Sequence, residues 1–218
     1  MPAFNTHRTF WDDPYQTELD TTVASVDGDW VTLKETIFFA FSGGQESDQG
    51  TINDLAVLQA QKTNDDIRYQ LARDHHFVPG QAVHVSIDWQ RRYRLMRSHF
   101  AAEAVLEMVS QELEGIERIG SHVAANKSRI DFLSDENLSP NFPHWTEQAN
   151  ALFAQDLPII KAFSDEVNQR RYWQVEGFAK VPCGGTHIHS TGEVGSIRLK
   201  RKNIGKGKER IEIYLVKD

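Results

Sequence analysis

Short stretches of hydrophobic and β-branched residues, separated by polar turn signals, recur through the first 88 residues of the chain and predict strands. Four such segments, rich in Thr, Val, Ile and Phe, cover residues 19–26, 30–41, 51–58 and 82–88. Asp27-Gly28-Asp29, between the first two, is typical of a tight hairpin turn. Several short strands joined by turns predict a small β-barrel over residues 1–88.

The pattern changes after residue 88. Residues 91–114 contain no Gly or Pro, and their apolar positions recur at helical spacing, which predicts a long helix. Further helices are expected over 144–155 and 164–171, the latter because Ser164 is a good N-cap. Strands are expected at residues 130–132, 187–200 and 210–217. Residues 89–218 therefore predict an α+β domain with helices packed on an antiparallel sheet.

Composition is ordinary for a globular protein, with 39% hydrophobic and 25% charged residues among 218. The single cysteine cannot form an internal disulfide, and we find no signal peptide and no apolar run long enough for a membrane span. These features predict a cytoplasmic location and no membrane partner. With a net charge of −7 the chain is not broadly basic, and DNA is not an expected partner.

A local basic run stands out against this acidic background. Between Arg198 and Arg210 the chain carries seven basic residues and one acidic residue. The positions of interest are Arg198, Lys200, Arg201, Lys202, Lys206 and Lys208. Gly205 and Gly207 suit a solvated hairpin turn, whereas the charge itself suits a phosphate-contacting patch, and the sequence leaves both interpretations open.

Two pairs of metal-ligating residue types occur far apart in the chain. Cys183-Gly184-Gly185-Thr186-His187 places the only thiol four positions from an imidazole, and both are preferred zinc ligands. His99 and Glu103 are four residues apart and would lie on one face of the long helix. The alternatives are a buried free cysteine near an unrelated histidine, and an ordinary salt-bridged helix face.

His189 complicates this assignment, because on a strand it would share a face with His187. It could be a fourth ligand, which would leave Glu103 free to act as a general base. A surface position for His189 is the alternative. A further segment, Gly43-Gly44-Gln45, combines a flexible backbone with an amide that can donate and accept hydrogen bonds, so it suits either a close approach to a ligand or a bulged loop.

Taken in order, five segments resemble the alanyl-tRNA editing proteins of the AlaX type and the editing domain of alanyl-tRNA synthetase. They are Trp11-Asp12-Asp13-Pro14-Tyr15, the loop from Ser42-Gly43-Gly44-Gln45 to Gly50-Thr51, Arg97-Ser98-His99, Cys183 to His187, and Thr191 to Gly195. The resemblance spans nearly the whole chain. It implies an N-terminal barrel with a glycine-rich loop over residues 1–88 and a metal-binding editing domain over 89–218.

The resemblance also implies an activity, the zinc-dependent hydrolysis of serine or glycine from tRNA for alanine. Carried over by position, the zinc ligands are His99, Cys183 and His187, while Glu103 stands where the family has a second histidine. Glu103 is then a further ligand or a catalytic group, and Gln45 and Thr186 are candidates to hold the substrate or the terminal adenosine. The six basic positions would contact tRNA.

Two mechanisms remain open at this level. A water oriented at the metal could attack the ester carbonyl, or the metal could hold the α-amino group and position the ester. Because of Glu103, the alternative functions are a non-catalytic tRNA- or metal-binding relative and a hydrolase of a different aminoacyl ester.

Overall fold

The computed structural model describes residues 6–63 and 66–216. Residues 1–5, 64–65 and 217–218 lie outside this description, although the two domains predicted from the sequence include them. The chain divides into two compact units, one formed by residues 1–42 and 46–93 and the other by residues 43–45 and 94–218. The short segment Gly43–Gln45 thus belongs to the second unit.

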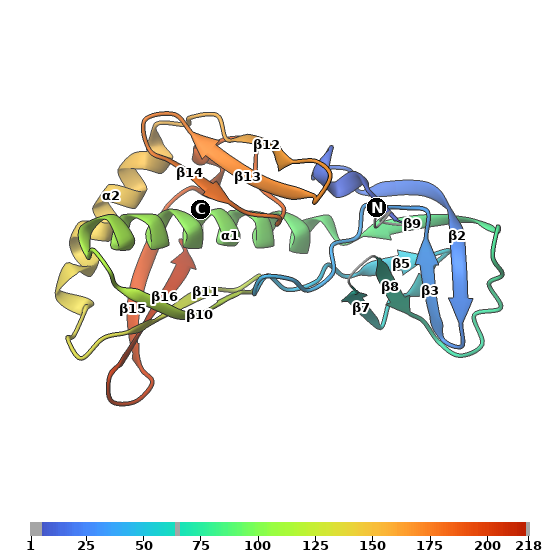
Figure 1. Ribbon diagram of the computed structural model, residues 1–218, viewed down its shortest axis with the longest axis horizontal. Helices are drawn as coiled ribbons and strands as arrows, with labels where there is room; N and C mark the ends of the chain where they lie inside the picture. Colours follow the sequence, from blue (N-terminus) through green and yellow to red (C-terminus); the bar gives the residue numbers. More distant parts are fainter. Residues whose placement is uncertain (1–5, 64–65, 217–218) are drawn as a thin grey trace. The chain divides into compact units, whose positions relative to one another are not determined.

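Antiparallel strands build the first unit (Figure 1). Its main sheet contains β2 (Glu18–Asp27), β3 (Trp30–Leu33), β5 (Gly50–Ile52), β6 (Leu55–Ala56), β7 (Gln59–Lys62), β8 (Ile67–Gln70) and β9 (Ala82–Ile87), in the order β6-β5-β9-β2-β3-β8-β7. A short parallel pair, β1 (His7–Arg8) and β4 (Glu35–Thr36), accompanies it. Gly28 turns the β2–β3 hairpin with a φ of 61°, a left-handed conformation that glycine adopts easily.

A buried arginine fixes the end of the glycine-rich loop in the first unit. The Arg92 side chain is fully buried and donates hydrogen bonds to Asp48 Oδ1 at 2.7 Å and to the Pro14 carbonyl oxygen at 2.9 Å. Asp48 also accepts a hydrogen bond from the Phe39 amide at 2.6 Å. Because a buried charge needs such partners, Arg92 joins the segment around Pro14 to the loop that follows Gln45.

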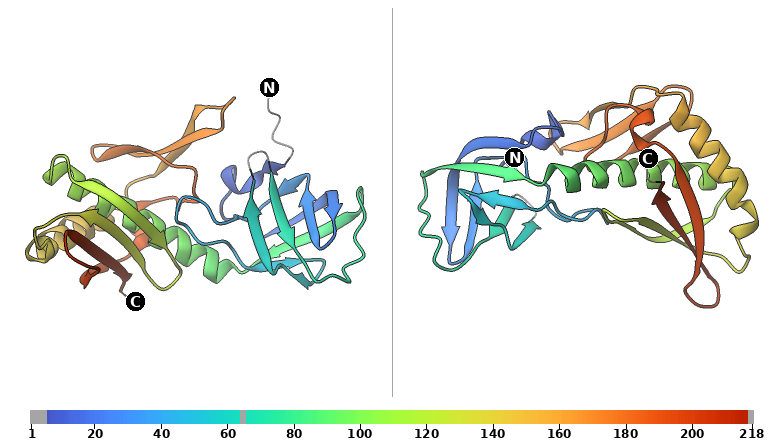
Figure 2. Two further views of the ribbon diagram at one scale, coloured as in Figure 1. Left: turned by 60° about the horizontal axis from the view of Figure 1, so that its bottom comes forward. Right: turned by 180° about the vertical axis from the view of Figure 1, so that it is seen from behind.

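The second unit is an α+β arrangement. Its helices are α1 (Trp89–Glu112), which enters this unit at Arg94, and α2 (Phe142–Ala154). One antiparallel sheet has the order β10 (Glu117–Val123), β11 (Ser128–Leu133), β16 (Lys208–Leu215) and β15 (Ile197–Asn203), and the other the order β12 (Ile160–Asp165), β13 (Arg170–Val175) and β14 (Ala179–Pro182). Figures 1 and 2 show α1 running between these two sheets.

Aromatic packing holds α1 in this position. Phe100 lies edge-on to Trp173 of β13, with ring centroids 5.2 Å apart, and also contacts Phe153 of α2. All three side chains are almost completely buried. On its other side α1 packs against the sheet of β10 and β11. The Ser128 hydroxyl of β11 donates a hydrogen bond to the Ser98 carbonyl oxygen of the helix at 2.9 Å.

The α+β class and the two helices expected near 91–114 and 144–155 are confirmed. The third expected helix, over 164–171, is wrong, because this segment contains the end of β12, the turn at residues 166–169 and the start of β13. The Asp165 carboxylate accepts a hydrogen bond from the Asn168 amide at 3.0 Å, and Gln169 has a φ of 51°. Asp and Asn stabilise such turns with their own side chains, and this local bonding outweighs the N-cap preference of Ser164.

The strand expected over 187–200 is also wrong for residues 187–196. Strand β15 begins at Ile197, and residues 191–194 form a 3-10 helix. Ser190 and Glu193 form a capping box, in which each side chain bonds the other's backbone. Among the described residues, no helix has the length and apolar character required to cross a bilayer.

Candidate metal centre

Four side chains with metal-ligating atoms converge in the second unit. One ligand atom from each of His99, Glu103, Cys183 and His187 lies within 4.8 Å of all the others. His99 and His187 are 7% and 3% exposed, and their rings stack with centroids 4.7 Å apart. The two segments expected to meet are therefore brought together, although they are 84 positions apart in the chain.

Helix α1 supplies the first pair. Nε2 of His99 lies 3.4 Å from Oε1 of Glu103, as expected for residues one helical turn apart. The second carboxylate oxygen of Glu103 lies 2.8 Å from Nε2 of His187. Glu103 thus faces both imidazoles, instead of pairing with a nearby arginine on the helix surface.

The segment after β14 supplies the second pair. The Cys183 amide donates to the Arg171 carbonyl oxygen at 2.9 Å, which fixes the end of β14, and the sulfur lies 3.6 Å from Nε2 of His99. Gly185 passes so close to the helix that a Cβ atom on it would lie 2.2 Å from Cε1 of His99. Only glycine permits this approach, whereas at Gly184 a Cβ would meet nothing within 4 Å.

Gln45 and Thr186 lie next to the metal-binding cluster and are hydrogen-bonded to each other. Nε2 of Gln45 donates to the Thr186 hydroxyl at 2.8 Å, and each residue is 1% exposed. The Thr186 carbonyl oxygen lies 3.2 Å from Nδ1 of His99. Because a carbonyl can only accept, Nδ1 carries a proton, and Nε2 is the nitrogen directed towards the cluster that would bind a metal ion, which is how metal-binding histidines are commonly oriented.

Glycine also explains how Gln45 reaches this position. Gly44 has a φ of 89°, and a Cβ there would lie 2.7 Å from the Ser121 carbonyl oxygen. Its own carbonyl oxygen accepts a hydrogen bond from the Val123 amide at 2.8 Å. The Gly43-Gly44-Gln45 segment therefore lies against β10 as a bridging strand segment and directs Gln45 towards Thr186.

The charges of the four groups depend on one another. Burial alone lowers the pKa of His99, but the charges of Glu103 and Cys183 outweigh it, so the pKa lies well above its usual value. Burial raises the pKa of Glu103, and the two histidines more than reverse this, so the pKa lies well below normal. Burial and Glu103 raise the pKa of Cys183, yet the histidines lower it on balance. A carboxylate with a depressed pKa and a thiol with a lowered pKa face two imidazoles with raised pKa values, so a bound cation could take the place of the protons in this cluster.

The geometry fits a divalent metal ion. Two imidazole nitrogens, a thiolate and a carboxylate oxygen, each with metal bonds of about 2.0–2.3 Å, are all established zinc ligands. Two donors of one tetrahedral ion with such bonds are about 3.3–3.8 Å apart, and the ligand atoms of this cluster all lie within 4.8 Å of one another. The four residues could therefore hold a metal ion without a large rearrangement of the backbone.

Comparison with known proteins places the chain in a family. The chain is 34% identical to alanyl-tRNA editing protein AlaX-M of Pyrococcus horikoshii, over 96% of this chain and 98% of that protein. It is 31% identical to the protein of the same name from Methanosarcina barkeri, over 97% and 99%. The chain belongs to the AlaX-M family of alanyl-tRNA editing proteins.

Two further matches relate the AlaX-M family to tRNA synthetases. The family described as threonyl and alanyl tRNA synthetase second additional domain matches residues 172–212, which include Cys183 and His187. Alanine–tRNA ligase of Methanococcus maripaludis is 29% identical over 97% of this chain, which corresponds to 26% of the ligase.

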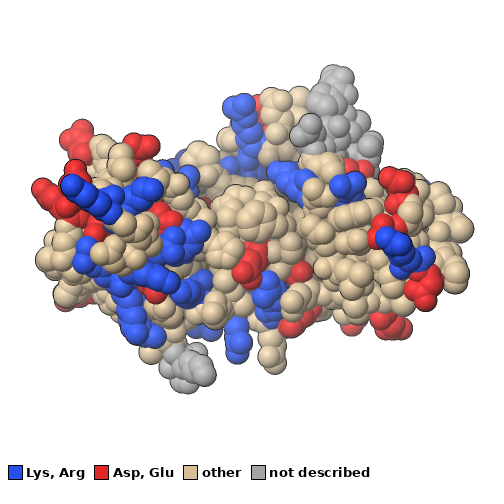
Figure 3. All heavy atoms as spheres, turned by 90° about the horizontal axis from the view of Figure 1, so that it is seen from below, with Lys and Arg blue, Asp and Glu red and all other residues tan. Residues whose placement is uncertain are grey.

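The basic positions of this AlaX-M family member lie on the β15–β16 hairpin but not on one face. Arg198, Lys200 and Lys202 alternate with the inward-facing residues of β15, and the Arg198 guanidinium lies 4.3 Å from the ring centroid of Tyr214. Arg201 is opposite the buried Ile211 and donates to Glu209 at 2.7 Å from Nε. Lys206 lies in the turn, and Lys208 begins β16. Figure 3 shows lysine and arginine side chains gathered over this part of the second unit.

The structure separates His189 from the metal-binding cluster, of which it is not one of the four members. Its Nδ1 lies 3.0 Å from Nζ of Lys161, and its amide donates to Glu193 at 2.8 Å. The capping box around Ser190 turns the chain after His187, so the two histidines do not share a strand face.

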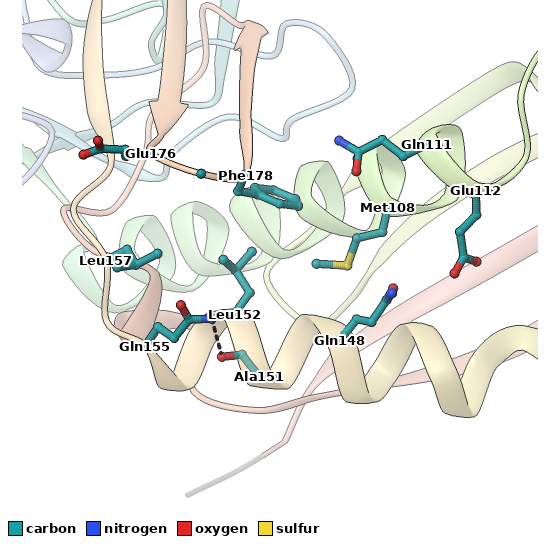
Figure 4. Close-up of a pocket in the computed structure, with 11 residues that line it drawn as sticks. Met108, Gln111, Glu112, Gln148, Ala151, Leu152, Gln155, Leu157, Glu176 and Phe178 are labelled. Atoms are coloured by element: carbon teal, nitrogen blue, oxygen red, sulfur yellow. Dashed lines mark hydrogen bonds between the residues drawn. The ribbon is translucent and has the colours of Figure 1, made fainter.

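Two pockets adjoin α1 on different faces. A pocket of about 300 Å³ begins at His99 and Glu103 and extends along α1 to Ser110. A larger pocket, of about 540 Å³, lies between α1, α2 and the turn at Glu176–Phe178 (Figure 4). His99 and Glu103 line the smaller pocket, and no member of the metal-binding cluster lines the larger one.

Proposed function

We propose that this chain hydrolyses the ester bond of mischarged tRNA for alanine, removing serine or glycine. It acts as an aminoacyl-tRNA deacylase in trans, consistent with its place among the AlaX-M editing proteins. The observation that carries the proposal is the convergence of His99, Glu103, Cys183 and His187 beside a pocket, in a chain that matches those proteins from end to end.

Zinc is the metal that best suits the donor set. His99, Cys183 and His187 hold it together with Glu103, which takes the position of a histidine in the family pattern. A bound zinc ion would supply Lewis-acid chemistry at the ester carbonyl. Gln45 and Thr186 orient His99 from behind, and their buried mutual hydrogen bond supports a positioning role for both.

The remaining assignments follow from the same proposal. The second unit, residues 43–45 and 94–218, is the editing domain, which the sequence predicted over residues 89–218. The first unit is a small barrel: β6 and β7 stand at opposite ends of the strand order, yet only Val57 and Leu58 separate them in the chain. The exposed residues of the β15–β16 hairpin contact tRNA, and the protein acts in the cytoplasm.

A direct assay tests the proposal. Purified protein is incubated with Ser-, Gly- and Ala-tRNA for alanine, and its metal content is measured in the same preparation. We expect deacylation of the serine or glycine ester in preference to the alanine ester. The absence of deacylation of all three at full zinc occupancy would contradict an editing function and favour a non-catalytic relative.

A further inference from the structure

The larger pocket, between α1, α2 and the turn after β13, has no part in the proposed function. Its volume of about 540 Å³ is sufficient for a small organic molecule. All the residues that line it belong to the second unit, and none of them is a member of the metal-binding cluster. The pocket is therefore a candidate for a second binding site.

Apolar side chains occupy the middle of this pocket. Met108 of α1 and Leu152 of α2 are buried, and the half-buried Leu157 lies beside them in the lining. Figure 4 shows the Phe178 ring directed from the turn towards Met108. The ring stacks on the buried Trp173, with centroids 6.3 Å apart, which supports its position. These side chains form an apolar floor that suits the methylene groups of an aliphatic chain.

A carboxylate lies at each end of this apolar floor. Figure 4 shows Glu112 at the end formed by α1 and Glu176 at the end formed by the turn, with Phe178 between them. The indole N–H of Trp145 donates to Oε2 of Glu112, and Nε2 of His144 lies 2.7 Å from Oε1. Each oxygen of a carboxylate can accept a second hydrogen bond, so Glu112 is held in place and still able to bind a donor.

The amide side chains in the lining add further acceptors. Nε2 of Gln111 donates to Glu107 at 2.9 Å, and Nε2 of Gln155 donates to the Ala151 carbonyl oxygen at 3.1 Å (Figure 4). Their Oε1 atoms are left as acceptors. Among the described residues that line the pocket there is no lysine, arginine or histidine. This lining favours a ligand that is cationic and donates hydrogen bonds.

We propose that this pocket binds an aliphatic polyamine, with ammonium groups at Glu112 and Glu176 and the methylene chain over the Phe178 ring. An inorganic cation would gain nothing from the apolar floor, and a monoamine would engage only one carboxylate. An ammonium group near the face of an aromatic ring is stabilised further. The inference goes beyond the proposed function and does not depend on it, since neither tRNA nor the metal-binding cluster takes part.

The test is calorimetric titration of the metal-loaded protein with spermidine and with N1-acetylspermidine. Acetylation removes the charge at one end of the molecule and keeps the chain. We expect it to weaken binding about three- to fivefold, as for the loss of one exposed ion pair. Nα-acetyl-lysine amide represents the basic side chain of a protein partner and should bind more weakly than spermidine. Equal affinity for all three compounds would overturn the proposal of a polyamine site.

Glu176→Gln tests the pocket from the side of the protein. It removes one carboxylate, so spermidine should bind about three- to fivefold more weakly and the effect of acetylation should become smaller. Glu147→Gln is the matched control, because Glu147 is exposed on α2, outside the pocket, and the net charge changes equally. Equal weakening by both variants would indicate diffuse attraction to an acidic protein and would overturn the proposal.

Ala151→Trp provides a steric test that leaves the charges unchanged. Ala151 is exposed on α2 and lines the pocket, so an indole there should abolish spermidine binding and leave the zinc content unchanged. Ala154→Trp, at the exposed end of α2 and outside the lining, is the matched control and should bind spermidine normally. Unchanged spermidine binding by Ala151→Trp would overturn the proposal. If Ala151→Trp does not fold, Glu176→Gln and N1-acetylspermidine still decide the question.

Discussion

Glu103 places its two carboxylate oxygens against two different imidazoles, those of His99 and His187. As a fourth ligand it would bring a negative charge that a histidine at this position would not, and this charge would offset that of a bound cation. Glu103→Ala should therefore lower zinc affinity by roughly a hundredfold or more, a loss at least as large as that for removing an outer-shell partner of a ligand.

Zinc content after dialysis against a chelator series measures this effect. Glu107→Ala is the matched control, because Glu107 is one helical turn further along α1 and is not a member of the metal-binding cluster. Equal zinc content in Glu103→Ala and in the unaltered chain would show that Glu103 is not a ligand. Glu103→His should retain zinc.

Neighbouring glycines provide a second comparison between single residues. Gly185→Ala places a methyl group 2.2 Å from the His99 ring and should displace it, with loss of zinc and of activity. Gly184→Ala should retain both, since nothing lies within 4 Å of the added atom. Metal analysis and circular dichroism of both variants check that only the site changes. Loss of zinc from both variants alike would contradict this steric argument.

Residue types and spacing predicted the convergence of His99, Glu103, Cys183 and His187, because ligand chemistry is local to each short motif. The hydrogen bond between Gln45 and Thr186 joins residues 141 positions apart, and no local pattern encodes it. The position of Arg118 beside α1 depends on the register of β10 with β11, which shifts between Arg118 and Gly120. Such tertiary relations need the folded chain.

At the scale of elements, the sequence pattern predicted the buried helix α1 correctly but failed for segments at the surface. Helix α1 contains no Gly or Pro and is buried along most of its length, so its long uninterrupted run with recurring apolar residues was enough to predict it. The 164–171 segment lies at the surface, where side-chain bonding by Asp165 decides the conformation. The capping box of Ser190 and Glu193 was visible in the sequence and could have corrected the strand predicted over 187–200.

The outer face of the four-stranded sheet depends on charge pairing across its strands. Burial raises the pKa of Asp131, but the hydrogen bonds and charges of Arg210 and Arg129 lower it on balance. A depressed pKa means that the ionised form stabilises the fold above the unfolded pKa near 3.8, and that this contribution disappears as the pH falls through the folded value.

Asp131→Asn should therefore lower the free energy of unfolding by about 1 to 2 kcal/mol at pH 7, because an amide cannot replace the charged hydrogen bonds. Urea unfolding measures the difference. The difference in the free energy of unfolding between Asp131→Asn and the unaltered chain should stay constant from pH 7 to about 5. It should shrink below the unfolded pKa, where the native carboxylate becomes protonated. A difference that is the same on both sides of this range would rule out an electrostatic cause.

At the scale of the whole molecule, a net charge of −7 opposes the approach of RNA, and a local basic surface must overcome it. The β15–β16 hairpin carries Arg198, Lys200 and Lys202 on its outer face. Arg210 also lies on this face but is paired with Asp131. The lysines on this face are therefore the charges best placed to displace counterions from a phosphate backbone.

Lys200 and Arg201 are adjacent, carry the same charge and lie on opposite faces of β15. Comparing their substitutions therefore separates the effect of losing a charge from the effect of its position. Lys200→Ala should reduce the slope of log affinity against log salt concentration by about 1, as expected for one lost phosphate contact. Arg201→Ala should change it much less, because Glu209 already neutralises its guanidinium. Filter binding of tRNA for alanine across a salt series measures both slopes. Equal reductions would show that the tRNA contacts the edge of the hairpin, and not its outer face.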